Sequence, residues 1–179
     1  MIVLVGASAS GKTELAKCLF ELYGYKKCIT TTTRQPRAHE KDGHDYHFLS
    51  QEAFIDKQKA DAFVEVTTYQ NAYYGIQKKD IQKNGVVILD PFGANALIKH
   101  THKDVFLCFV FCDIAVRKSR MESRGDHLCD IIKRLEEDQV RFQAHKIDRI
   151  DLTIDNSEGS LINQAKQLHQ AYQYHLKSK

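Results

Sequence analysis

Eight consecutive residues near the start of the chain combine the types that bind a nucleoside triphosphate. Residues 6–13 read GASASGKT, with a glycine at each end of the loop, followed by lysine and threonine. Glycine allows the backbone to curl until consecutive N–H groups point inward as a nest for phosphate oxygens. In such a phosphate loop the lysine reaches the β- and γ-phosphates, and the threonine hydroxyl is a ligand for Mg²⁺. The predicted triphosphate site therefore consists of Gly6, Ala7, Ser8, Ala9, Ser10, Gly11, Lys12 and Thr13, with Mg²⁺ on Thr13.

The segments on either side of this loop are those that must position it. Residues 1–5 form an apolar run typical of a buried strand, and residues 14–22 place their apolar side chains on one helical face. The helix directs the positive end of its dipole at the loop. A second polar group follows another apolar run, residues 86–89, where Asp90 occupies the strand-end position at which phosphate-loop enzymes hold an acid near Mg²⁺. The alternative for Asp90 is an acid that only caps the next turn.

Strands and helices alternate along most of the chain. Further strands are predicted at residues 27–30, 105–111 and 152–154, and helices at residues 78–83, 93–99, 114–123, 130–142 and 160–176. Alternation of this kind predicts an α/β fold, in which a parallel sheet carries helices on both faces.

Residues 30–75 interrupt the alternation with short, polar strands around residues 45–48, 62–66 and 72–75. A helix is predicted at residues 51–59, with Ser50 as its N-cap. We interpret this segment as a small mixed insertion that closes over a second substrate, because phosphoryl transfer between two small molecules requires exclusion of water.

Composition and charge are those of one globular domain. The 179 residues are 42% hydrophobic and 27% charged, with a net charge of +3 that suits an anionic small molecule and is too weak to indicate nucleic acid. The chain begins directly with the predicted strand, and no stretch approaches the ~20 apolar residues of a membrane span, so we expect a cytoplasmic protein without a membrane anchor. The five cysteines lack paired spacing and are expected to be free thiols.

Several motifs after the phosphate loop carry a resemblance to a known family. They are TTRQPR at residues 32–37 with Glu40, DYHF at residues 45–48, FVE at residues 63–65, YYG at residues 73–75, and the basic stretches at residues 120–125 and 133–135. In this order the motifs are similar to those of guanylate kinases, and they span most of the chain. The resemblance implies ATP and GMP as substrates.

The resemblance also implies roles for individual residues of the insertion. Two guanidinium groups and two tyrosine hydroxyls would hold the phosphate of GMP, namely those of Arg34, Arg37, Tyr46 and Tyr74. Glu65 would accept hydrogen bonds from guanine N1–H and N2–H, and Thr30 would place a hydroxyl near the base. Without the resemblance, a solvated basic loop with tyrosines in the core would explain the arginines and tyrosines equally well, and an outward-facing strand glutamate would be the commoner explanation of Glu65.

The later motifs are expected to supply a lid and an adenine-side contact. The arginines Arg120, Arg124 and Arg134 would act on the transferred phosphoryl group, although helical ion pairs with nearby glutamates are the alternative. Asn156 follows the last predicted strand and is assigned to the ATP site.

Two positions depart from the family pattern, both at the base pocket. Ile76 replaces a usual hydroxyl residue, and Phe92 replaces the second acid of a usual Asp-x-Asp. Both changes remove polar groups from the base pocket and leave the phosphate-binding residues intact.

Together these features predict a single guanylate kinase-like domain over residues 1–179. A phosphate-loop NTPase core with a five-stranded parallel sheet comprises residues 1–29 and 76–179, the mixed GMP-binding insertion residues 30–75, and an arginine lid about residues 120–134. The predicted reaction is ATP + GMP to ADP + GDP, by a monomer or homodimer. The alternatives are a kinase of the same fold for another phosphorylated acceptor, such as a ribose bisphosphate, and a non-catalytic protein-binding module. The intact phosphate loop argues against the module.

Overall fold

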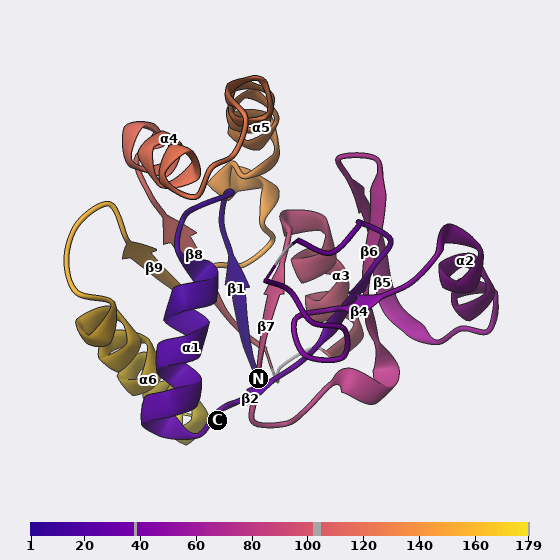
Figure 1. The fold of residues 1–179 in the computed structure, drawn as a ribbon. Coiled ribbons are helices and arrows are strands. Elements are labelled where there is room, and N and C mark those ends of the chain that lie inside the picture. Colours follow the sequence, from indigo (N-terminus) through magenta and orange to yellow (C-terminus); the bar gives the residue numbers. More distant parts are fainter. Residues whose placement is uncertain (38, 102–104, 179) are drawn as a thin grey trace.

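A five-stranded parallel sheet runs through the centre of the molecule in the computed structural model, which describes residues 1–37, 39–101 and 105–178 (Figure 1). The strands lie in the order β2-β7-β1-β8-β9 and all neighbours pair in parallel. Their bounds are β1 Ile2–Val5, β2 Lys26–Lys27, β7 Gly85–Leu89, β8 Phe106–Phe111 and β9 Leu152–Asp155. The central strand β1 is buried along its whole length, which explains its unbroken apolar sequence. The predicted α/β class and five-stranded parallel sheet are confirmed.

Helices cover both faces of this sheet. On one face α1 (Lys12–Tyr23) and α6 (Leu161–Lys177) lie side by side and bury Leu15 and Leu168 against Ile2 of β1 (Figure 1). On the opposite face α3 (Pro91–Thr101) packs Leu97 against Val3. Because each face of the sheet has its own apolar cluster, the carboxyl ends of the strands are held rigidly, and the phosphate loop extends from one of them.

A second sheet stands beside the core, with strands β4 (His47–Phe48), β3 (Thr30–Thr32), β6 (Ala72–Gln77) and β5 (Phe63–Tyr69) in that order. Helix α2 (Gln51–Lys59) covers its outer side, where the Phe54 ring stacks 4.5 Å from that of Phe63 (Figure 1). The Ser50 hydroxyl accepts a hydrogen bond from the Ala53 N–H at 3.2 Å, as predicted for the N-cap. This sheet provides one wall of the cavity described below.

Two helices, α4 (Ile114–Ser123) and α5 (Leu128–Arg141), stand over the carboxyl ends of β1 and β8 (Figure 1). The chain reverses between them at Gly125, whose φ of +83° favours glycine. We refer to α4, α5 and the turn between them as the lid.

Two predicted elements were wrong. Residues 78–83 form only a short 3₁₀ turn, Lys78–Asp80, because Ile81 is the only apolar residue among them and a helix would have no face to bury. The single strand predicted at residues 27–30 is divided: β2 ends at Lys27 in the core sheet, and β3 begins at Thr30 in the second sheet. The chain therefore crosses from one sheet to the other at this point. A further 3₁₀ turn, Ala144–Lys146, follows α5.

The sequence predicts free thiols and no membrane-spanning segment. All five cysteines are free thiols, as predicted. Among the described residues, no helix has the length and apolar character needed to cross a bilayer.

Candidate active site

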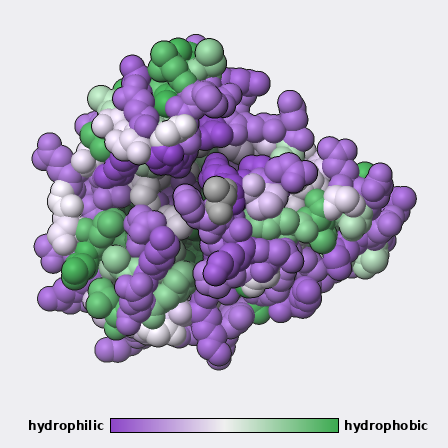
Figure 2. All heavy atoms as spheres, in the orientation of Figure 1, coloured by the Kyte–Doolittle hydropathy of each residue, from purple (hydrophilic) through white to green (hydrophobic). Residues whose placement is uncertain are grey.

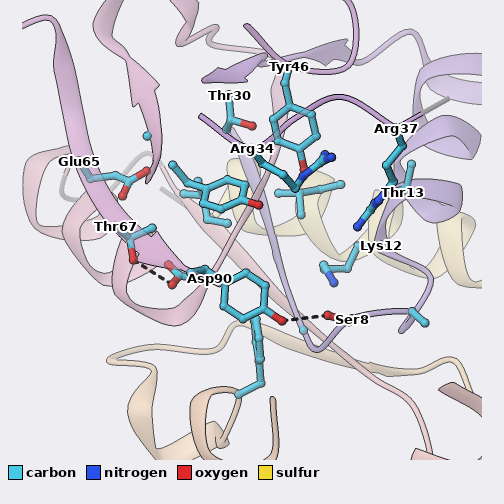
Figure 3. Close-up of a pocket in the computed structure, with 18 of the residues that line it drawn as sticks. Ser8, Lys12, Thr13, Thr30, Arg34, Arg37, Tyr46, Glu65, Thr67 and Asp90 are labelled. Atoms are coloured by element: carbon cyan, nitrogen blue, oxygen red, sulfur yellow. Dashed lines mark hydrogen bonds between the residues drawn. The ribbon is translucent and has the colours of Figure 1, made fainter. Parts of the chain in front are cut away.

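A cavity of about 210 Å³ opens where the carboxyl ends of β1 and β7 meet the second sheet and the lid (Figure 3). The surface in this part of the molecule is predominantly hydrophilic (Figure 2). Predicted site residues that line the cavity are Gly6, Ser8, Ala9, Lys12, Thr13, Thr30, Arg34, Arg37, Tyr46, Glu65, Tyr74, Asp90 and Arg124. The cavity is also lined by Thr67, Tyr69, Gly75, Ile88, Leu89 and Phe142. Residues from three separate parts of the chain thus share one cavity.

The phosphate loop requires glycine at both of its ends. A Cβ atom on Gly6 would lie 2.3 Å from the Val110 carbonyl oxygen, so the loop could not pass this close to β8 with any other residue. Gly11 has a φ of +93° and is the N-cap of α1. The loop therefore ends at a helix N-terminus whose dipole favours an anion.

Two predicted site residues support the loop from behind. The Asn156 side-chain amide donates to the Ser10 carbonyl oxygen at 2.8 Å. The Arg120 guanidinium donates to the Ala9 carbonyl oxygen at 3.2 Å and to the Asn156 carbonyl oxygen at 2.8 Å. Ala7, Ser10, Gly11, Arg120, Arg134 and Asn156 are not among the residues that line the cavity.

The Lys12 ammonium group turns back on the loop, where it donates to the Ala7 carbonyl oxygen at 2.7 Å. The pKa of Lys12 is lowered to about 8, chiefly by burial and to a smaller extent by the charges of Arg117 and Arg124, while the charge of Asp138 opposes the shift. A phosphate anion would restore the ordinary pKa by replacing the missing negative charge. Lys12 is thus in an environment suited to a polyanionic ligand.

The predicted phosphate-gripping residues converge from β6 and from the loop before β4. The Arg34 guanidinium makes two 2.8 Å bonds to the Glu40 carboxylate and lies 5.4 Å from the centre of the Tyr46 ring. The rings of Tyr46 and Tyr74 meet edge to face at 6.3 Å. Glu40 also accepts from the Arg37 N–H at 2.8 Å, so one carboxylate organises both arginines. Apart from its place in a motif, nothing local to Glu40 marks it for this function.

Glu65 faces the same cavity from β5 (Figure 3). Glu65 is only 6% exposed to solvent. Neither oxygen of its carboxylate makes a well-formed hydrogen bond to any described residue. Burial and the charge of Asp90 raise the pKa of Glu65 to about 8, against weak opposition from the Ile76 N–H. A Cβ on Gly93 would lie 2.9 Å from Glu65 Oε2, so glycine at that position keeps the carboxylate accessible.

Asp90 is already engaged by protein groups. Its Oδ1 accepts from the Gly93 N–H at 2.8 Å, and its Oδ2 accepts from the Thr67 hydroxyl at 3.1 Å. The Arg141 guanidinium also binds Oδ2, through Nε at 2.8 Å and through a second nitrogen. Arg141 lies over the rings of Tyr69 and Phe92, at 5.1 and 5.4 Å from their centres. The sequence analysis missed Arg141, which follows the predicted lid and matches no motif.

The lid arginines are gathered by another acid. Asp126 Oδ2 accepts from Arg124 at 2.6 Å and from Arg134 at 2.9 Å. Burial by itself would raise the pKa of Asp126, but these two cations keep that pKa below its usual range. Arg124 lines the cavity, and Asp126 holds Arg134 next to it. No three metal-binding side chains (His, Cys, Asp or Glu) cluster in the described part of the chain.

Comparison with known proteins decides the family. A family model described as guanylate kinase matches residues 1–174. The chain belongs to the guanylate kinase family. Among relatives, a guanylate kinase of Onion yellows phytoplasma is 35% identical over 161 residues, which cover 84% of this chain and 76% of the relative. A guanylate kinase of Mycoplasma genitalium is 30% identical, over 88% of this chain and 69% of the relative. Guanylate kinase activity follows from this membership.

Solved structures show the same fold. The guanylate kinase of Anaplasma phagocytophilum matches with a TM-score of 0.70 at 18% identity, over 97% of this chain and 85% of that one. A gluconokinase from Sinorhizobium meliloti matches with a TM-score of 0.57 at 15% identity, over 99% and 97%. Guanylate kinases and gluconokinases thus share this core architecture, and at these identities the likeness concerns the fold alone.

Proposed function

We propose that the cavity binds ATP along the phosphate loop and GMP against the second sheet, and that the γ-phosphoryl passes directly between them. The lining of the cavity supports this arrangement. Ser8, Lys12 and Thr13 lie on one side of it, Thr30 and Glu65 lie on the other, and Arg34 and Tyr46 lie between them (Figure 3). Two bound substrates would then present donor and acceptor to each other with no covalent intermediate on the protein.

The residues at the ATP end fit Mg²⁺ only in part. Thr13 is exposed at the start of α1 and lines the cavity, so its hydroxyl is available as a ligand. The Asp90 carboxylate is not available as a metal ligand, because its oxygens already accept hydrogen bonds from Arg141, Thr67 and the Gly93 N–H. We therefore assign Thr13 as the protein ligand of an Mg²⁺ ion that arrives with ATP, which would neutralise phosphate charge. Asn156 and Arg120 are reassigned as supports of the loop.

At the acceptor end, the two arginines and two tyrosines suit a phosphate monoester. Planar guanidinium groups bind a dianion with charge-assisted, paired hydrogen bonds, and tyrosine hydroxyls add further donors. Glu40 holds Arg34 in place for this contact.

The observation that carries the choice of base is the Glu65 carboxylate, which is buried, makes no well-formed hydrogen bond to a described residue and is directed into the cavity. Guanine offers N1–H and N2–H donors side by side, and a carboxylate accepts both. Adenine presents an acceptor at N1, which cannot pair with the ionised carboxylate. Thr30 adds a hydroxyl on the same side of the cavity.

Transfer itself requires little covalent chemistry from the protein. Lys12, Arg124 and Arg134 would neutralise the charge that spreads over the γ-phosphoryl in the transition state, and closure of the lid would exclude water. To reach the phosphoryl group, Arg124 and Arg134 would release the Asp126 carboxylate and bind the phosphoryl oxygens in its place.

The experiment that tests this assignment follows product formation with ATP and GMP by wild type and by Lys12→Ala. Wild type should release ADP and GDP in equal amounts, and Lys12→Ala should nearly abolish turnover with an unchanged circular dichroism spectrum. Near-normal turnover in the folded variant would remove Lys12 from the mechanism.

A further inference from the structure

A buried ion pair joins the two lid helices at a point that the proposed chemistry does not use. Arg117 of α4 and Asp138 of α5 lie 2.6 Å apart, and their side chains are 7% and 0% exposed. Such a pair contributes little net stability, because removing both charges from water costs about as much as their attraction returns. Its value lies in the geometry that it imposes on its neighbours.

Those neighbours include both backbone polar groups of one residue in the phosphate loop, Ser8. The Ser8 N–H donates to Asp138 Oδ2 at 2.7 Å, and the Ser8 carbonyl oxygen accepts from Arg117 Nε at 2.8 Å. Ser8 lines the cavity in the middle of the phosphate loop. The lid therefore holds the backbone of the loop on two sides, with two charge-assisted hydrogen bonds.

A third part of the molecule reaches the same point. The Tyr69 hydroxyl, from β5 of the second sheet, donates to Asp138 Oδ1 at 2.9 Å and lies 3.2 Å from the Ser8 hydroxyl. The Tyr69 ring packs 6.4 Å from the ring of Tyr74, one of the residues assigned to the acceptor phosphate. A continuous set of contacts thus runs from Tyr74, at the proposed acceptor-phosphate site, through Tyr69 and Asp138 to the phosphate loop.

We propose that Arg117 and Asp138 are positioning residues for the phosphate loop, and that Tyr69 couples occupancy of the acceptor site to the affinity of that loop for the nucleoside triphosphate. Movement of Tyr74 onto an acceptor phosphate shifts Tyr69, and Tyr69 acts on Ser8 directly and through Asp138. Because binding free energies are reciprocal, each substrate changes the affinity for the other by the same factor. This inference rests on the proposed positions of ATP and GMP.

The first test measures that factor by calorimetry. A non-hydrolysable ATP analogue is titrated into enzyme with and without saturating GMP, for wild type, Tyr69→Phe and Tyr73→Phe. Tyr73 is the matched control, since it lies in the same sheet with its ring stacked 5.5 Å from Phe54, on the side of α2. Wild type and Tyr73→Phe should bind the analogue about fivefold or more tightly with GMP present. In Tyr69→Phe, which loses only the hydroxyl, the ratio should fall toward one.

A wild-type ratio of one, or an unchanged ratio in Tyr69→Phe, would overturn the proposed coupling. Failure of either substrate to bind wild type alone would instead contradict the proposed function, so the two failures are distinguishable.

The second test concerns Arg117. Arg117→Lys keeps the charge that balances Asp138 but cannot reproduce the planar two-point contact with Asp138 and the Ser8 carbonyl. The KM for ATP should rise several-fold with a much smaller change in the KM for GMP. A folded Arg117→Lys enzyme with normal kinetic constants would show that the pair only joins the lid helices. If Arg117→Lys fails to fold, the Tyr69→Phe result decides.

Discussion

At the scale of single residues, three positions bear on how Glu65 would recognise a base. Ile76 brings no hydroxyl, Phe92 brings no carboxylate, and Asp90 is bound by Arg141. Glu65 is consequently the one carboxylate that lines the described cavity without a well-formed hydrogen bond. Base recognition should therefore depend mainly on Glu65, with the Thr30 hydroxyl as a second contact.

The raised pKa of Glu65 makes GMP affinity depend on pH. In the free enzyme this pKa is about 8, so below pH 8 the carboxyl is mainly protonated and must lose its proton to accept from both guanine donors. The dissociation constant for GMP should fall about fivefold as pH rises from 7 to 8, and it should level off above about pH 9. Calorimetry in two buffers of different ionisation enthalpy would detect the released proton. The Glu65→Gln variant should show neither effect, and a flat profile in wild type would contradict the assignment.

The same pKa predicts a cost in stability. For an acid whose folded pKa is raised from 4.5 to about 8, the charged form opposes folding, so the cost is absent below about pH 4.5 and complete above about pH 8. Glu65→Gln should therefore raise the free energy of unfolding of the ligand-free protein by on the order of a few kcal/mol at pH 8, and much less at pH 5. Chemical denaturation at both pH values measures this difference. Equal effects at the two pH values would show that Glu65 is not protonated in the fold.

At the scale of elements, an acidic residue of the lid, Asp126, pairs with two of the lid's arginines. Asp126 binds Arg124 and Arg134 and keeps two like charges close together beside the cavity. In the mechanism proposed above, the transferred phosphoryl group would carry more charge than one carboxylate, so exchange of Asp126 for phosphate would become favourable as the transition state forms.

This arrangement predicts that Arg124→Ala lowers kcat by at least ~100-fold while the KM for GMP changes little, since the contact forms mainly in the transition state. Steady-state kinetics with both substrates varied measures the two constants separately. Lys118→Ala is a matched control, because Lys118 is an exposed cation of α4 that pairs at 3.8 Å with Glu122. A change confined to KM for GMP would make Arg124 a binding residue.

At the scale of the whole molecule, the parts with strong local signals could be predicted from the sequence. The buried strand β1, the phosphate loop and α4 follow from hydrophobic pattern and motif. The transfer of the chain between sheets at Thr30 could not be predicted, because one β-prone run continues through both strands. Ion pairs between distant residues could not be predicted either. Asp90 and Arg141 lie 51 residues apart in the chain, and nothing in the local sequence indicates that they pair.

The most direct measurement is a coupled ADP-release assay of wild type and Glu65→Gln with GMP, IMP and AMP as acceptors. IMP lacks only the exocyclic amine and still offers N1–H to Glu65. Wild type should prefer GMP, then IMP, then AMP, by less than the ~10⁴-fold that a fully paired site can reach. Glu65→Gln should lower kcat/KM for GMP by about 1–3 kcal/mol of transition-state binding and leave the KM for ATP unchanged. Retention of the full preference for GMP over IMP and AMP by Glu65→Gln would contradict recognition of guanine by this carboxylate.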